Sequence, residues 1–215
     1  MLSIDHRVRK YSALGDPIRL KILDLLAISD LSPSCLIEIL GINSNLLSHH
    51  LDVLEEAQLV SRKISNADGR RRYVSIVASE FKNVEIPKLR VEPVLFVCTK
   101  NSGRSQLASA LWTAITHQHS GSAGIRPANH ISPDAELAAR NCGLHLIAQT
   151  PKSIDDESEW AQVITVCDIA YEEVGERNGW LHWSSNVPEK LKGPRKFERL
   201  IEMFRSRIQF SVAGL

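Results

Sequence analysis

The run VLFVC at residues 94–98 ends at a cysteine and is followed by the loop TKNSG and by Arg104. A continuous apolar run of this kind is typical of a strand buried in a parallel sheet. The segment SQLASALWTAITHQ, residues 105–118, then has the apolar spacing of a helix. A strand, a loop and a helix in this order begin an α/β unit. The sequence therefore predicts a parallel sheet in the second part of the chain, with the loop at the carboxyl end of one strand.

Later segments agree with this fold class. PDAELAARNCG, residues 133–143, has the spacing of a helix, and WAQVITVCD, residues 160–168, ends in a second buried strand. The tail PRKFERLIEMFRSRIQF, residues 194–210, predicts an amphipathic helix with one apolar face made by Phe197, Leu200, Ile201 and Phe204.

The chemistry of this region centres on residues 98–104, which we name the anion loop. A thiolate is nucleophilic only when its pKa is lowered, and amides at the start of a helix achieve this by presenting positive partial charge. The same amides can hold a tetrahedral oxyanion, and the planar fork of Arg104 can bind two of its oxygens. Ser105 can donate a hydrogen bond to the thiolate. We expect Cys98, Arg104 and Ser105 to act as catalytic residues, and the oxyanion contacts to come from Thr99, Lys100, Asn101, Ser102, Gly103 and Arg104.

The first third of the chain has a different pattern. Residues 11–28 and 31–40 predict amphipathic helices, and residues 44–58 predict a third, capped by Ser44, with Leu47, Leu51 and Leu54 facing inward. The segments 59–65 and 70–77 alternate like two strands around the turn NADG. We name residues 59–77 the basic hairpin, because it carries a local cluster of arginines. Helices joined by a tight turn and followed by such a hairpin indicate a winged helix-turn-helix.

In a winged helix, the third helix fits the major groove of DNA, and basic side chains of the wing neutralise phosphates. The alternative is that the polar face of this helix and the tip of the basic hairpin are merely solvated. Taken together, the order of the elements favours DNA binding. The predicted DNA-binding residues are Ser44, Asn45, Ser48, His49, Arg70, Arg71 and Arg72.

The mixed segment SEFKNVEIPKLRVEP contains two prolines and predicts a linker. We therefore expect a mainly α winged helix-turn-helix domain at residues 1–78, a linker at 79–92, and a three-layer α/β domain at 93–215. The net charge of +1 leaves any basic surface local. No apolar stretch approaches the roughly 20 residues that a bilayer span needs, and the first residues lack a secretory signal, so a cytoplasmic protein is expected.

The front domain resembles the ArsR family of winged-helix repressors in ALGDPIRLKILDLL, SNLLSHHLDVLEEAQLV and GRRRYVSI, over about residues 8–78. The resemblance implies a homodimer on a pseudo-palindromic, double-stranded DNA operator. Metal-sensing members of the family often carry Cys-x-Cys in the second helix. This chain has only Cys35 there, offset from that motif, and we expect it to lie in the core. No metal and no cofactor are predicted.

The second domain resembles the low-molecular-weight tyrosine phosphatases and the arsenate reductases built on the same fold, in VLFVCTKNSGRSQLASALW, SAGIRPA, VITVCD and LHWS. In such enzymes an aspartate, usually in Asp-Pro, protonates the leaving oxygen. Here Val187 precedes Pro188, with Asn186 beside it, so the expected general acid is absent. Arsenate reduction also needs a second thiol. Cys167 is the better candidate and Cys142 the worse, although either can simply be a buried residue.

Three hypotheses follow. The first is a DNA-binding transcriptional repressor whose second domain binds or senses an oxyanion, such as phosphate or arsenate, or an oxidant. The second is a repressor that is also an arsenate reductase or tyrosine phosphatase, with Cys98 as nucleophile. The third is a purely structural second domain. The missing acid favours the first hypothesis, whereas Cys98, Arg104 and Ser105 keep the second open.

Overall fold

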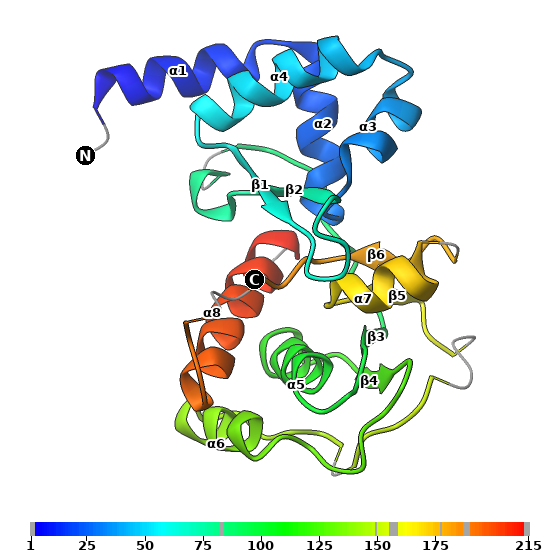
Figure 1. Cartoon of the computed structure of the whole chain (residues 1–215). Coiled ribbons are helices and arrows are strands. Elements are labelled where there is room, and N and C mark those ends of the chain that lie inside the picture. The colour runs from blue at the N-terminus through cyan, green and yellow to red at the C-terminus, as the bar shows by residue number, and fades with distance from the viewer. Residues whose placement is uncertain are drawn as a thin grey trace. The chain divides into compact units, whose positions relative to one another are not determined.

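The computed structural model describes residues 3–81, 84–148, 150–154, 159–176, 178–186 and 190–212. The chain divides into two compact units, Met1–Lys88 and Leu89–Leu215. Figure 1 shows the helices of the first unit in blue and cyan, and the sheet and helices of the second unit in green to red. Within the described residues, no helix combines the length and the apolar character that are needed to cross a membrane.

The first unit begins with four helices, α1 (Ile4–Leu14), α2 (Pro17–Ile28), α3 (Pro33–Leu40) and α4 (Ser44–Glu56). Asp16 caps α2 by accepting from the N–H groups of Ile18 and Arg19, each at 2.9 Å. The third predicted helix is capped by Asn43 and not by Ser44, because the Asn43 side chain accepts from the N–H of Leu46 at 2.9 Å. Ser44 is thus the first residue of the helix, with its hydroxyl exposed.

The core of the first unit forms where the predicted apolar faces meet. Leu47, Leu51 and Leu54 of α4 are buried, as the helical spacing predicted. Gly41 ends α3 with a φ of 64°, a conformation that glycine adopts without a steric cost. The basic hairpin forms the antiparallel strands β1 (Val60–Ile64) and β2 (Arg72–Ile76), and the 3-10 helix η1 (Ala78–Phe81) follows. The predicted order of helices and hairpin is therefore present, except that the helix predicted over residues 11–28 is divided into α1 and α2 at Gly15 and Asp16.

The second unit has a four-stranded parallel sheet in the order β4-β3-β5-β6, which confirms the predicted parallel sheet. Its strands are β3 (Val94–Cys98), β4 (Ser120–Gly124), β5 (Gln162–Thr165) and β6 (Leu181–His182). The helices are α5 (Arg104–Thr116), α6 (Pro133–Asn141), α7 (Asp168–Ala170) and α8 (Pro194–Ser211), and α7 continues into a π-helix, η2 (Tyr171–Gly175). Figure 1 shows α5, α6 and α8 together on one side of the sheet.

Strand β3 is buried over its whole length, because it lies between β4 and β5. Helix α5 packs on β3 and β4 and is covered in turn by α8. Trp112 of α5 is fully buried and meets Phe96 of β3 edge to face, at 5.9 Å between ring centroids. This packing fixes the end of β3 relative to the start of α5, and the anion loop joins these two points.

Candidate functional site

Cys98 is the last residue of β3, and Arg104 is the first residue of α5. The Cys98 side chain is 3% exposed, and its Sγ lies 3.1 Å from the Ser105 Oγ. The backbone N–H of Asn101 also donates to this sulfur, at 3.2 Å. The sulfur of Cys98 therefore has two hydrogen-bond partners, one in the anion loop and one in the first turn of α5.

Asn101 fixes the shape of the anion loop. It is fully buried and has a φ of 49°, a region that asparagine tolerates better than most residues. Its Oδ1 accepts from the backbone N–H of Lys152 at 2.8 Å, which settles the orientation of the amide. Its Nδ2 therefore donates to the Ser105 Oγ at 2.9 Å. Since Ser105 accepts this bond, its single hydroxyl proton remains available to Cys98.

The carbonyl groups of the anion loop are held by the segment after β4 and by the start of α6. The N–H groups of Ile125, Arg126, Ala128 and Ser132 donate to the carbonyls of Cys98, Thr99, Lys100 and Ser102, at 3.2, 2.9, 2.9 and 2.8 Å. Gly124 allows this close approach, because a Cβ there would lie 2.8 Å from the Asn101 nitrogen. Four of the loop carbonyls are thus bonded to neighbouring segments outside the loop.

The backbone amides behave differently. Among the described residues, no acceptor is found for the N–H groups of Lys100, Ser102, Gly103 and Arg104. The guanidinium of Arg104 likewise has no hydrogen-bond or ion-pair partner within the described part of the chain. Amides and a cation without acceptors at the start of a helix are the groups that bind a tetrahedral anion. The predicted oxyanion residues therefore form one continuous loop around Cys98.

Cys167 follows β5 and is fully buried beside the anion loop. Its Sγ lies 3.1 Å from the Oγ1 of Thr99, the residue next to Cys98. The fold thus brings Cys167 into contact with the residue that follows Cys98 in the anion loop. Cys142 lies instead at the end of α6, where burial raises the pKa of its thiol. Cys35, which was expected in the core, lies in α3 of the first unit and is only half-buried.

The expected position of the general acid, Val187-Pro188, lies outside the described residues. Among the carboxylates that follow Cys167, Asp168 and Glu173 have identified partners. Asp168 is buried, and its Oδ1 lies 3.1 Å from the Nε2 of His182, which is also fully buried. Glu173 accepts two hydrogen bonds from Arg126, and these bonds lower the pKa of the carboxyl. Glu173 is therefore ionised near neutral pH and cannot donate the missing proton.

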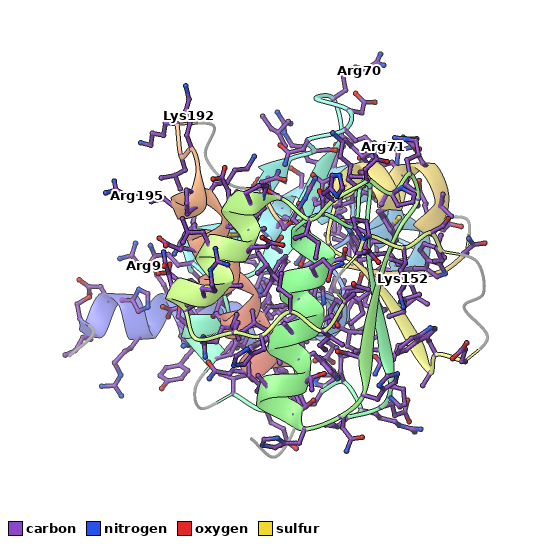
Figure 2. All side chains as sticks on the ribbon, turned by 90° about the horizontal axis from the view of Figure 1, so that it is seen from below. Arg9, Arg70, Arg71, Lys152, Lys192 and Arg195 are labelled. Carbon is purple, nitrogen blue, oxygen red and sulfur yellow. The ribbon has the colours of Figure 1, made fainter. Side chains whose placement is uncertain are left out.

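The predicted DNA-binding residues of α4 are all exposed. A groove of about 280 Å³ runs between α3, α4 and the basic hairpin. Its floor contains Leu47 and Leu51, and its polar lining comes from Ser44, Ser48, Arg62 and Arg72. Three of the predicted DNA-binding residues thus line one groove: Ser44 and Ser48 of α4, and Arg72 of the hairpin. Asn45 and His49 lie on α4 outside this groove, and Figure 2 shows Arg70 extended at the hairpin tip, with Arg71 labelled nearby.

Sequence reasoning missed the contacts of Arg62 and the position of His50. Arg62 forms ion pairs with Asp52 at 2.5 Å and Glu55 at 3.3 Å, and so joins β1 to α4. His50, on the same helix, is 5% exposed, and burial lowers its pKa. No sequence signal distinguishes His50 from the adjacent, exposed His49 except its place in the buried stripe of α4.

Comparison with known families agrees with these two sites. Residues 16–62 match the family described as bacterial regulatory protein, arsR family, and residues 93–182 match the low molecular weight phosphotyrosine protein phosphatase family. The transcriptional repressor SdpR of Bacillus subtilis (strain 168) is 39% identical over 51 residues, which are 24% of this chain and 57% of that protein.

Among solved structures, the thioredoxin-dependent arsenate reductase Cg_ArsC1' of Corynebacterium glutamicum is 28% identical with a TM-score of 0.43, over 62% of this chain and 63% of that one. An arsenate reductase of Archaeoglobus fulgidus DSM 4304 is 21% identical with a TM-score of 0.44, and the match covers 54% of this chain and 95% of that one. The chain spans less than two thirds of the length of SdpR and of Cg_ArsC1'. Both expected resemblances are confirmed: the chain joins an ArsR-family helix-turn-helix region, residues 16–62, to a low molecular weight phosphotyrosine protein phosphatase domain, residues 93–182.

Proposed function

We propose that this protein is a DNA-binding transcriptional regulator, and specifically a repressor, whose second domain binds a tetrahedral oxyanion in the anion loop. The oxyanion part rests on the backbone amides of the loop and on the guanidinium of Arg104, for which no acceptor is found among the residues that the structure describes. Phosphate and arsenate both have the charge and shape that such a loop holds. The buried Cys98 lies at its centre and can also react with an oxidant.

The DNA-binding part rests on the exposed polar face of α4 beside the basic hairpin. Ser44 and Ser48 line the same groove as Arg72, so base-edge and phosphate contacts can be made together. Asn45, His49, Arg70 and Arg71 extend this surface along the helix and to the hairpin tip. The family resemblance adds a homodimer on a two-fold symmetric operator, and we propose that the protein acts in the cytoplasm, where such an operator lies.

The regulatory link requires that the anion favours one of two states that differ in affinity for DNA. The test uses the full chain and a duplex selected from a random DNA pool. Operator affinity is measured by fluorescence anisotropy with and without phosphate, arsenate, arsenite or hydrogen peroxide. At least one of these is expected to change the affinity, and Arg104→Gln is expected to remove the response to phosphate and arsenate while leaving the affinity of the anion-free protein unchanged. Equal affinity under all conditions would contradict the regulatory link.

A second candidate function, arsenate reduction, is favoured by the contact between Thr99 and Cys167. In this reaction the Cys98 thiolate bonds to arsenic as one As–O bond breaks and that oxygen, protonated from solvent, leaves as water. The Cys167 thiolate then attacks the Cys98 sulfur, the sulfur–arsenic bond breaks with its electron pair going to arsenic, and arsenite leaves as the disulfide forms. An external dithiol then reduces the disulfide. Arsenite formation that is lost in Cys98→Ser and reduced in Cys167→Ser would establish this activity, and no arsenite at high protein concentration would exclude it.

A further inference from the structure

We propose that Arg126 is a second anion-binding arginine of the anion loop, and that Glu173 competes with the anion for it. This inference rests on the proposed oxyanion site and identifies a residue that sets its affinity. The first observation is the position of the backbone. Ile125 and Arg126 donate to the carbonyls of Cys98 and Thr99, so the segment after β4 runs directly along the loop.

The second observation is the direction of the side chain. Both terminal nitrogens of Arg126 donate to the Glu173 carboxylate, one of them at 2.9 Å. Glu173 belongs to η2, which begins four residues after Cys167. The Arg126 guanidinium also lies close enough to Cys167 for a charge interaction, and this interaction adds to that of Glu173 in raising the pKa of Arg126. Because the Cys167 sulfur contacts Thr99, the guanidinium lies on the side of the loop that carries these two residues.

The third observation concerns strength. The Arg126 side chain is 59% exposed and that of Glu173 is 42% exposed. An ion pair this open to water is weak, so a bound ligand can break it. A carboxylate and a tetrahedral oxyanion offer an arginine the same two-oxygen geometry, and an oxyanion with two negative charges attracts the guanidinium more strongly. The Glu173 carboxylate therefore occupies the nitrogens of the Arg126 guanidinium that a bound oxyanion would contact.

The experiment measures how phosphate protects Cys98 from alkylation by iodoacetamide, with mass spectrometry to quantify the Cys98 peptide alone. It compares the full-length wild type with Glu173→Gln, Arg126→Gln and the double variant. Glu173→Gln is expected to lower the phosphate concentration for half protection roughly two- to fivefold, the factor that corresponds to an exposed ion pair. Arg126→Gln is expected to raise it by a similar factor. The double variant is expected to match Arg126→Gln.

The control is Glu202→Gln, which removes the acid of another solvent-exposed ion pair, Arg199 with Glu202, on α8. It should leave protection unchanged. Tryptophan fluorescence during urea unfolding checks that each variant is folded. If phosphate protects the wild type but the Arg126 and Glu173 variants behave like the control, or if the gain in Glu173→Gln survives without Arg126, the inference is wrong while the oxyanion site stands. If phosphate does not protect wild-type Cys98, the oxyanion site itself is refuted.

Discussion

Replacement of Asn101 by alanine tests whether this one side chain holds the anion loop. Asn101→Ala removes one hydrogen bond to Ser105 and two bonds accepted by Oδ1, from the Lys152 backbone and from the buried Gln106. Each contributes about 1 kcal/mol net, and the loss leaves buried donors without acceptors. Alanine also adopts the positive φ of this position at a cost of roughly 1 kcal/mol more. The expected loss in the free energy of unfolding is about 3–5 kcal/mol.

Tryptophan fluorescence during urea unfolding measures this loss in the right unit, because all four tryptophans, at positions 112, 160, 180 and 183, lie within Leu89–Leu215. Asn101→Gly removes the same hydrogen bonds but accommodates the positive φ, so it should be about 1 kcal/mol more stable than the alanine variant. A loss below about 1 kcal/mol in Asn101→Ala would refute the reasoning on the hydrogen bonds. A glycine variant that is less stable than the alanine variant would refute the reasoning on the backbone.

Three further outcomes are expected. Gly124→Ala should destabilise the second unit by about 1–3 kcal/mol in the same assay, since its Cβ would lie 2.8 Å from the backbone nitrogen of Asn101, and unchanged stability would contradict this close approach. Arg71→Ala with Arg72→Ala should weaken operator binding and lower the slope of log affinity against log salt by about 2, and unchanged binding would exclude the hairpin from the interface. Burial lowers the pKa of His50, so the unfolded state binds more protons, and the first unit should lose stability as pH falls from about 6.5 toward the folded-state value. His50→Gln should remove this part of the pH dependence, measured by amide exchange of α4; an unchanged dependence would show that other groups cause it.

The elements predicted from the sequence are those with strong local signals. The buried run at residues 94–98 and the helix after it could be read directly, because an apolar run and helical spacing need no tertiary information. Helix α1 was not separated from α2, since it is polar and its exposed Ile4, Val8 and Tyr11 do not mark a buried face. Strand β4, with the sequence SGSAG, was missed because serine and glycine have low strand propensity, and only pairing with β3 makes it a strand.

The candidate site likewise combines residues that the local sequence predicts with contacts that it does not predict. Cys98 and Arg104 could be placed from their spacing and from the strand and helix around them. The partners of Asn101 could not, because Lys152 reaches it from 51 residues away. The pair of Arg126 and Glu173 spans 47 residues, and nothing in either local sequence indicates it. Side chains that meet only through the order of strands in the sheet leave no periodic signal, so these contacts required the three-dimensional structure.

Whether the anion loop only binds an oxyanion or also transforms it depends on a proton donor for the leaving oxygen, rather than on the nucleophile Cys98. The Cys98 sulfur already has its donors, and the loop amides and Arg104 can stabilise charge on a bound oxyanion. Protonation of a leaving oxygen needs a carboxylic acid, which contributes roughly 10²–10⁴-fold. In the anion-free structure Arg126 lowers the pKa of the Glu173 carboxyl, and Asp168 is a buried partner of His182. The sequence has Val187 rather than an aspartate before Pro188, so under the proposed function we expect the oxyanion to stay bound in the loop rather than to be transformed, as a regulator requires.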